Sequence, residues 1–131
     1  MTENLKDKIR VGVVGAGGIA NGFHIPSFIA HPNAKVVAIC DVDEARAKAT
    51  ADRYDVPRIY TQYEQLFASG EIDAVTVTTP NNMHYPPVMA ALEAGLHVIC
   101  EKPLAMNAQQ ASQMYQLAEN NNQVVVKVEN T

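Results

Sequence analysis

Hydrophobic residues in this chain are concentrated in short runs, and longer stretches of mixed polarity separate the runs. The runs are rich in β-branched residues and show little polar alternation, which is typical of strands covered on both faces. They lie at Ile9–Val14, Lys35–Cys40, Asp73–Thr79, His97–Cys100 and Gln123–Val128, with a weaker run at Arg58–Tyr60. Because strands of this kind occur in parallel sheets, the pattern predicts a parallel sheet of six strands.

The stretches between the runs have helical periodicity. Apolar residues recur at the i, i+3, i+4, i+7 spacing in 85–92 and again in 111–118, and Gly95 follows the first stretch as a stop signal. Asp43 can cap a helix over 44–53. Strands that alternate with helices through short connections predict a doubly wound α/β sheet of the Rossmann type. We expect the strand order 3-2-1-4-5-6.

The two cysteines test this order. Cys40 ends the second predicted strand and Cys100 ends the fifth, three strand positions away. At about 4.8 Å per position they would be roughly 14 Å apart, beyond the ~7 Å limit for a disulfide. Both are therefore predicted to be free, buried thiols, and two cysteines alone do not make a metal site.

Length and composition limit the function classes. The chain has 131 residues, of which 47% are hydrophobic, and this suits one globular domain spanning residues 1–131. A net charge of −4 disfavours nucleic-acid binding, which needs a surplus of Lys and Arg. No run approaches the ~18 apolar residues of a membrane span. The first residues lack the apolar core of a secretion signal, so we expect a cytoplasmic protein without a membrane or nucleic-acid partner.

The segment directly after the first predicted strand carries a G-x-G-x-x-A motif, Gly15-Ala16-Gly17-Gly18-Ile19-Ala20. Gly15 permits a tight turn out of the strand, and Gly17 lets a pyrophosphate approach the backbone. Ala20 lets the following helix pack closely on the sheet. The helix N-terminus then offers N–H groups and partial positive charge to phosphates. The motif therefore predicts a dinucleotide site.

Asp41 ends the next predicted strand, 24 positions after Gly17. An acid about 20 residues after the motif binds the ribose hydroxyls of the dinucleotide. Its charge would repel a 2′-phosphate, and Val42 follows where a basic residue could have bound one. NAD is therefore favoured as the cofactor, with NADP as an alternative because Arg46 is near. From the residues alone, Asp41 could instead be a turn residue or a helix cap.

Two further segments follow the fourth and fifth predicted strands, where a doubly wound sheet places its ligand. They are Thr78-Thr79-Pro80-Asn81-Asn82-Met83-His84 and Cys100-Glu101-Lys102-Pro103. Together with the glycine motif, they make the chain resemble the Gfo/Idh/MocA oxidoreductases, the family of glucose–fructose oxidoreductase and inositol dehydrogenase. The resemblance runs from about residue 9 to residue 126.

The resemblance implies roles for individual residues. Lys102 corresponds to the catalytic lysine beside the nicotinamide and the substrate hydroxyl, and Glu101 to an acid near the nicotinamide ribose. Thr79, Pro80, Asn81 and His84 match the loop that lines the cofactor's path. Ile19 and Ala20, beside Gly18, match backbone contacts beneath the pyrophosphate.

Residue chemistry alone leaves two of these roles open. Lys102 stands between an apolar strand and a proline, and poor solvation would lower its pKa toward the range useful for proton transfer. It could equally be a surface lysine paired with Glu101. His84 could be a packed residue at the start of a helix.

Members of this family continue into a second domain that forms the substrate pocket, whereas the sequence here ends just after the sixth predicted strand. We therefore expect the cofactor domain of an enzyme that acts on a sugar-like or polyol substrate, inactive without the substrate domain. The surface that would meet that domain could then support self-association. The alternative is a non-catalytic dinucleotide-binding module, although such a module has no need of a proton-transfer lysine.

Overall fold

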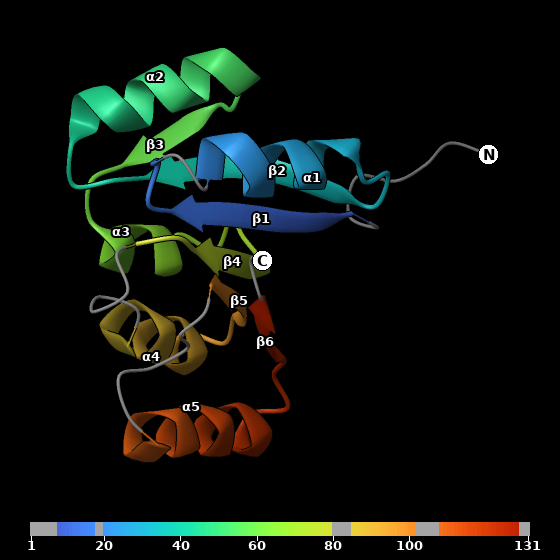
Figure 1. Cartoon of the computed structure of the whole chain (residues 1–131), viewed down its shortest axis with the longest axis vertical. Helices are drawn as coiled ribbons and strands as arrows, with labels where there is room; N and C mark the ends of the chain where they lie inside the picture. Colours follow the sequence, from blue (N-terminus) through green and yellow to red (C-terminus); the bar gives the residue numbers. More distant parts are fainter. Residues whose placement is uncertain (1–7, 18–19, 80–84, 102–107, 129–131) are drawn as a thin grey trace.

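The computed structural model describes residues 8–17, 20–79, 85–101 and 108–128 (Figure 1). At its centre is a β-sheet in which neighbouring strands pair in parallel, in the order β3-β2-β1-β4-β5-β6. The strands are β1 (Ile9–Val14), β2 (Ala34–Cys40), β3 (Arg58–Tyr60), β4 (Ala74–Val77), β5 (His97–Glu101) and β6 (Val125–Val128). The predicted parallel, Rossmann-type α/β architecture is confirmed.

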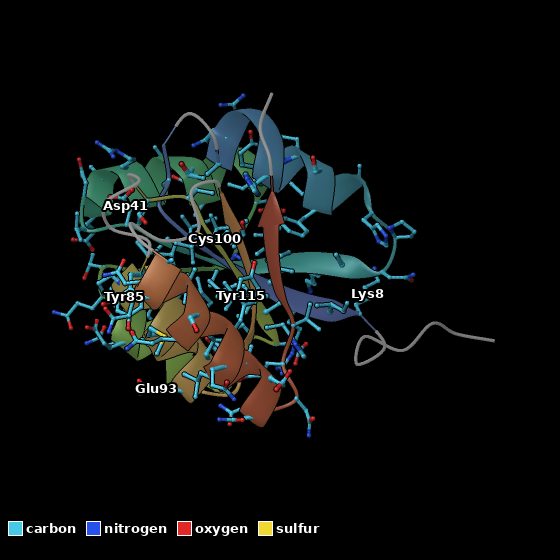
Figure 2. All side chains as sticks on the ribbon, turned by 60° about the horizontal axis from the view of Figure 1, so that its bottom comes forward. Lys8, Asp41, Tyr85, Glu93, Cys100 and Tyr115 are labelled. Carbon is cyan, nitrogen blue, oxygen red and sulfur yellow. The ribbon has the colours of Figure 1, made fainter. Side chains whose placement is uncertain are left out.

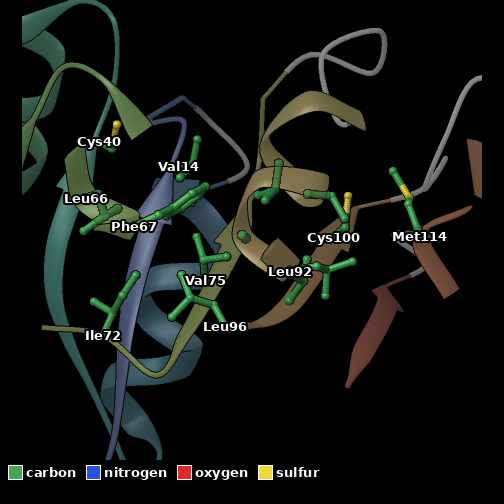
Figure 3. Close-up of a cluster of buried hydrophobic side chains, with 14 of the residues drawn as sticks. Val14, Cys40, Leu66, Phe67, Ile72, Val75, Leu92, Leu96, Cys100 and Met114 are labelled. Atoms are coloured by element: carbon green, nitrogen blue, oxygen red, sulfur yellow. The ribbon is translucent and has the colours of Figure 1, made fainter. Parts of the chain in front are cut away.

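Helices cover both faces of this sheet (Figure 1). They are a π-helical turn, η2 (Ala20–His24), followed by α1 (Ile25–Ala30), α2 (Glu44–Tyr54), α3 (Tyr63–Phe67), α4 (Tyr85–Glu93) and α5 (Ala108–Asn120). One buried cluster packs α1 and α2 against β1 and β2. The other packs α3, α4 and α5 against the opposite face (Figure 3). The sheet is therefore wound on both sides, as the alternation of runs predicts.

The helical periodicity read from the sequence is correct for α4 and only partly so for α5. In α4, Val88 and Leu92 are fully buried, and the chain leaves the helix at Gly95, whose φ is +88°. In α5, Met114 is fully buried, whereas Tyr115 is 48% exposed. The difference arises because α5 is the last helix of its layer, with α4 against only one of its sides.

The order in which successive strands are added to the sheet reverses between β1 and β4. β1 pairs with β2 on one side and with β4 on the other, so the first three strands run outward one way and the last three the other way. Ligands of such sheets bind beyond the carboxyl ends of the strands at this switch point. Figure 2 shows the two ends of the sheet, with Lys8 before β1 and Asp41 after β2 on opposite sides of the molecule.

Neither cysteine forms a disulfide and both are buried, as predicted. Cys40 lies at the end of β2 and Cys100 in β5, with β1 and β4 between these strands, and the two lie on opposite sides of the same cluster (Figure 3). Burial, together with the negative charges of Asp41 and Glu64, raises the pKa of Cys40 to about 12. Its thiolate is therefore scarce at neutral pH, and Cys40 is a packing residue and not a nucleophile.

Within the described ranges, no helix has both the length and the apolar character needed to cross a membrane. The same ranges hold no group of three or more His, Cys, Asp or Glu side chains placed to bind a metal ion.

An ion pair fixes the other end of the sheet, away from the switch point. The Arg10 guanidinium donates through Nη2 to Asp73 Oδ1 at 2.9 Å and through Nε to Oδ2 at 3.2 Å. The backbone N–H of Arg10 also donates to Oδ2, at 2.9 Å. The side-chain hydrogen bond from Arg10 is the main cause that lowers the pKa of Asp73 below 3.8.

This lowered pKa predicts a pH dependence of stability. Because the folded pKa lies below the unfolded one, Asp73 stabilises the fold above about pH 4, and this contribution is lost as the pH falls through the folded pKa. We expect Asp73→Asn to lower the free energy of unfolding by about 1 kcal/mol at neutral pH, since the pair is partly solvent-screened. The difference between the variant and the parent should shrink as the pH falls below about 4 and through the folded pKa of Asp73. Urea unfolding over a series of pH values measures this.

Asp52→Asn is the matched control. Asp52 accepts one hydrogen bond, from the Lys48 ammonium at 3.2 Å, and both side chains are about two-thirds exposed. We expect this substitution to change stability by less than about 0.5 kcal/mol. An Asp73→Asn effect no larger than that of the control would contradict the assignment.

Candidate functional site

The glycine motif forms a tight turn at the carboxyl end of β1. Gly15 has φ +100°, and its N–H donates to the carbonyl of Cys40 at 2.8 Å. A Cβ at this position would lie 2.9 Å from the backbone of Thr78, a separation that real side chains essentially never show. Thr78 closes the turn, since its hydroxyl lies 2.6 Å from the Gly15 carbonyl and 3.1 Å from the Val14 carbonyl. The fold itself, independently of any ligand, therefore requires glycine at position 15.

Gly17 has a different environment. A Cβ built on it would meet no heavy atom of the described residues within 4 Å, and its φ is not in the left-handed region. The protein therefore has room for a side chain at Gly17, and the absence of one leaves the backbone open to an approaching group. Ala20, by contrast, is fully buried in the cluster beneath α1 and α2. This burial agrees with close packing of the helix on the sheet.

Asn21 supports the turn from below, and the sequence analysis missed it. Its side-chain amide donates to the carbonyls of Ala16 and Gly17, both at 3.0 Å, and lies 3.2 Å from the Thr50 hydroxyl. These bonds hold the turn's carbonyls toward the protein. The signal available in the sequence was an amide side chain directly after the motif.

Asp41 is only 7% exposed, and its carboxylate is bonded to the protein. Oδ2 accepts the N–H of Ala16 at 2.8 Å, and Oδ1 accepts the N–H of Asp43 at 2.9 Å. Nη1 of Arg46 lies 3.7 Å from Oδ2. Asp41 therefore joins the glycine turn to the N-terminus of α2, where Asp43 is the capping residue. This geometry matches the alternative role as a turn residue, and it leaves a ribose-binding role as a prediction.

A pocket of about 600 Å³ opens at this edge of the sheet. The glycine turn forms its floor, and the ends of β2 and β4 and the starts of α3 and α4 form its walls. The residues that line it are Val14, Gly15, Ala16, Gly17, Cys40, Asp41, Val42, Arg46, Thr61, Gln62, Tyr63, Glu64, Thr78, Thr79, Pro86 and Pro87. Four predicted site residues, Gly15, Gly17, Asp41 and Thr79, are thus brought together in one cavity.

The remaining predicted residues are not all described. Gly18, Ile19, Pro80, Asn81, His84 and Lys102 lie outside the described residues. Glu101 ends β5, where its backbone pairs with Val128. Because β4 and β5 pair in register up to Val77 and Cys100, the carboxyl end of β5 lies at the same edge of the sheet as the pocket.

The connection from β3 to α3 supplies a wall that the sequence analysis did not find. Tyr63 is partly buried there, with its ring centroid 5.4 Å from that of Phe67. Burial is the main cause that raises the pKa of its phenol, and the neighbouring Glu64 adds to the shift. The phenol therefore stays neutral at physiological pH, and Tyr63 is an uncharged aromatic residue in the lining of the pocket, to which Val42 also belongs.

A second, smaller groove of about 410 Å³ lies next to the pocket, between the glycine turn and α2. The residues that line it are Ala16, Gly17, Asn21, Arg46, Ala49, Thr50 and Arg53. Three of these residues, Ala16, Gly17 and Arg46, also line the larger pocket, so the two cavities adjoin at the turn.

Known proteins share sequence and fold with this chain. Residues 9–129 match the oxidoreductase family with an NAD-binding Rossmann fold, Gfo/Idh/MocA. The chain belongs to this family. The predicted membership is therefore confirmed, as is the prediction of a nicotinamide-dinucleotide-binding fold.

Individual relatives support the assignment. The chain is 36% identical to D-glucoside 3-dehydrogenase of Escherichia coli (strain K12), over 81% of this chain and 30% of that protein. It is 40% identical to D-xylose 1-dehydrogenase (NADP(+)) 2 of Haloferax volcanii, over 82% of this chain and 33% of that protein. The chain thus spans about a third of the length of these relatives.

A solved structure gives the same result for the fold. A mutant of KijD10, a 3-ketoreductase from Actinomadura kijaniata in complex with TDP-benzene and NADP, superposes with a TM-score of 0.88 at 30% sequence identity. The match covers 92% of this chain and 38% of that one.

Proposed function

We propose that this chain is the cofactor domain of an oxidoreductase that transfers a hydride between a nicotinamide dinucleotide and a sugar-like or polyol substrate. The observation that carries the proposal is Gly17, where the backbone is open toward the pocket in a turn that Thr78, Asn21 and Asp41 hold by hydrogen bonds. An open backbone at the start of a helix suits a pyrophosphate. The family and the named relatives support the reaction class.

The pocket residues fit the rest of a dinucleotide. The backbone of Gly15–Gly17 would lie beneath the pyrophosphate, with Gly18, Ile19 and Ala20 continuing into the helix. Asp41 would border the adenosine ribose. The apolar surface of Val42 and Tyr63 suits the flat face of adenine, because aromatic and aliphatic groups stack on such rings.

The catalytic residues are proposed from the family motif. A bound nicotinamide accepts or donates the hydride. Lys102 would exchange the proton of the substrate hydroxyl, and Glu101 would lie toward the nicotinamide ribose. Thr79, Pro80, Asn81 and His84 would line the path between the two halves of the cofactor. The position of Thr79 in the lining of the pocket supports this part of the proposal.

We also propose that residues 1–131 form one dinucleotide-binding unit and that a second domain positions the substrate. Orienting a substrate against its partner contributes roughly 7–11 kcal/mol to catalysis at best, and a single lysine fixes neither distance nor angle. We propose that the isolated unit self-associates through the surface that would face such a domain. Gel filtration measures this self-association.

Titration of the purified chain with NADH and NADPH, followed by nicotinamide fluorescence, tests the proposal. We expect saturable binding without turnover of sugars, inositols or other polyols. Failure to bind either dinucleotide would overturn the cofactor assignment. Steady turnover that disappears in Lys102→Ala would confirm the lysine and overturn the need for a second domain.

A further inference from the structure

The helical segment after the glycine motif begins with the π-helical turn η2, and a residue of another helix completes its hydrogen bonds. A π-helix bonds each carbonyl to the N–H five residues later. Continued by one residue, this pattern pairs the carbonyl of Asn21 with Pro26, which has no N–H. The Tyr54 hydroxyl, from the last residue of α2, donates to the Asn21 carbonyl instead, at 2.6 Å.

α2 holds Asn21 at two points. Thr50 and Tyr54 lie one helical turn apart on α2, so both can face η2. The Thr50 hydroxyl lies 3.2 Å from the side-chain amide nitrogen of Asn21, whereas the Tyr54 hydroxyl binds the backbone. The Tyr54 ring packs against the buried cluster beneath α1 and α2, and Cζ of Arg53 lies 5.1 Å from its centroid. These contacts fix the direction of the Asn21 side chain.

The Asn21 amide in turn sets the direction of the peptides in the glycine turn. Its Nδ2 donates to the carbonyls of Ala16 and Gly17, both at 3.0 Å. In a trans peptide the N–H points opposite to the carbonyl. The N–H of Gly17 shares its peptide with the Ala16 carbonyl and therefore points away from Asn21. Such N–H groups at the start of a helix are the donors that bind phosphate oxygens.

We propose that Tyr54 is a positioning residue for the dinucleotide. Its hydroxyl completes η2, keeps the Asn21 amide beneath the turn and thereby directs the Gly17 N–H toward the pyrophosphate. Tyr54 is not among the residues that line the two described cavities, so it acts through Asn21 and not by contact with the ligand. The inference rests on the proposed function, because that function places the pyrophosphate on the glycine turn.

Titration of Tyr54→Phe with NADH and with ADP-ribose tests the inference. The substitution keeps the ring in the cluster and removes one hydrogen bond, so the midpoint of thermal unfolding should fall by about 4 °C. We expect the dissociation constants of both ligands to rise by about fivefold, because both carry the pyrophosphate.

Tyr60→Phe is the matched control. The Tyr60 hydroxyl donates to Oε1 of Glu71 at 2.7 Å, and it has no bond to η2 among the described residues. This substitution also removes one hydroxyl hydrogen bond, so it should lower the unfolding midpoint by a similar amount. It should leave both dissociation constants within about twofold of the parent, since the glycine turn is untouched.

A double-mutant cycle with Asn21→Ala separates positioning from stability. Asn21→Ala keeps the backbone carbonyl that accepts the Tyr54 hydroxyl and removes the side-chain amide, so it should itself weaken binding by at least as much as Tyr54→Phe. In the Asn21→Ala background, Tyr54→Phe should still lower the unfolding midpoint but change the dissociation constants by less than about twofold. An undiminished effect on affinity in that background, or unchanged affinity in Tyr54→Phe alone, would overturn the inference. Failure of the parent chain to bind NADH and ADP-ribose would overturn the proposed function itself.

Discussion

Replacing Gly17 with valine is expected to abolish NADH binding while leaving the fold intact. The described part of the chain has space for the new side chain, because a Cβ at this position meets none of its heavy atoms within 4 Å. Its backbone is outside the left-handed region, so we expect a change of less than about 1 kcal/mol in the free energy of unfolding. The isopropyl group would occupy the space through which a pyrophosphate approaches, and affinity should fall at least a hundredfold.

Gly15→Ala is the matched control for this result. The same turn at Gly15 has φ +100° and only 2.9 Å to the Thr78 backbone, so even one methyl group is strained there. We expect a loss of about 1–3 kcal/mol in stability from the backbone conformation alone. Thermal melts and fluorescence titrations of both variants give the comparison. If Gly17→Val binds NADH as the parent does, the motif is only a turn and the cofactor site lies elsewhere.

Replacing Asp41 with alanine is expected to weaken both stability and cofactor binding. The substitution leaves the N–H groups of Ala16 and Asp43 without their acceptor and removes the partner of Arg46. Each buried donor left unsatisfied costs about 1–3 kcal/mol. Because some water can reach the site after truncation, we expect a total loss of about 2–4 kcal/mol, measured by urea unfolding at neutral pH.

Two related substitutions sharpen this test. Asp41→Asn keeps one carbonyl acceptor, so its loss of stability should lie between the parent and the alanine variant. Asp43→Ala removes only the cap bond to the N–H of Arg46, at 3.2 Å on an exposed residue, and should cost about 1 kcal/mol. An Asp41→Ala variant as stable as Asp43→Ala would show that the carboxylate does not hold the turn.

The parts of the fold that were predictable are those in which local pattern and burial agree. β1 is a nearly continuous apolar run because buried clusters lie on both of its faces, with Val13 in one cluster and Val14 in the other. The buried face of α4 could be predicted because Val88 and Leu92, which have helical spacing in the sequence, are both fully buried. The five residues of α3 were not predicted, since one helical turn carries too little periodicity.

The candidate site was predictable only where backbone geometry sets the residue type. Position 15 must be glycine because its φ is positive and the Thr78 backbone lies close to it, so the sequence motif predicts this residue. Asp41 was recognised, but the direction of its carboxylate depends on N–H groups that the fold brings together from Ala16 and Asp43. Tyr63 and Arg53 join the site through tertiary packing, which leaves no mark in their local sequence.

The hydrogen bonds around the glycine turn have a consequence for the thermodynamics of ligand association. Thr78, Asn21 and Asp41 hold the turn from three separate elements before any ligand arrives. A loop that is already ordered loses little conformational entropy on binding, so more of the contact energy appears as affinity. The backbone N–H groups of Gly15 and Ala16, which donate to Cys40 and Asp41, should therefore be protected from hydrogen exchange in the free chain, and the dinucleotide should add little to the protection of these two groups.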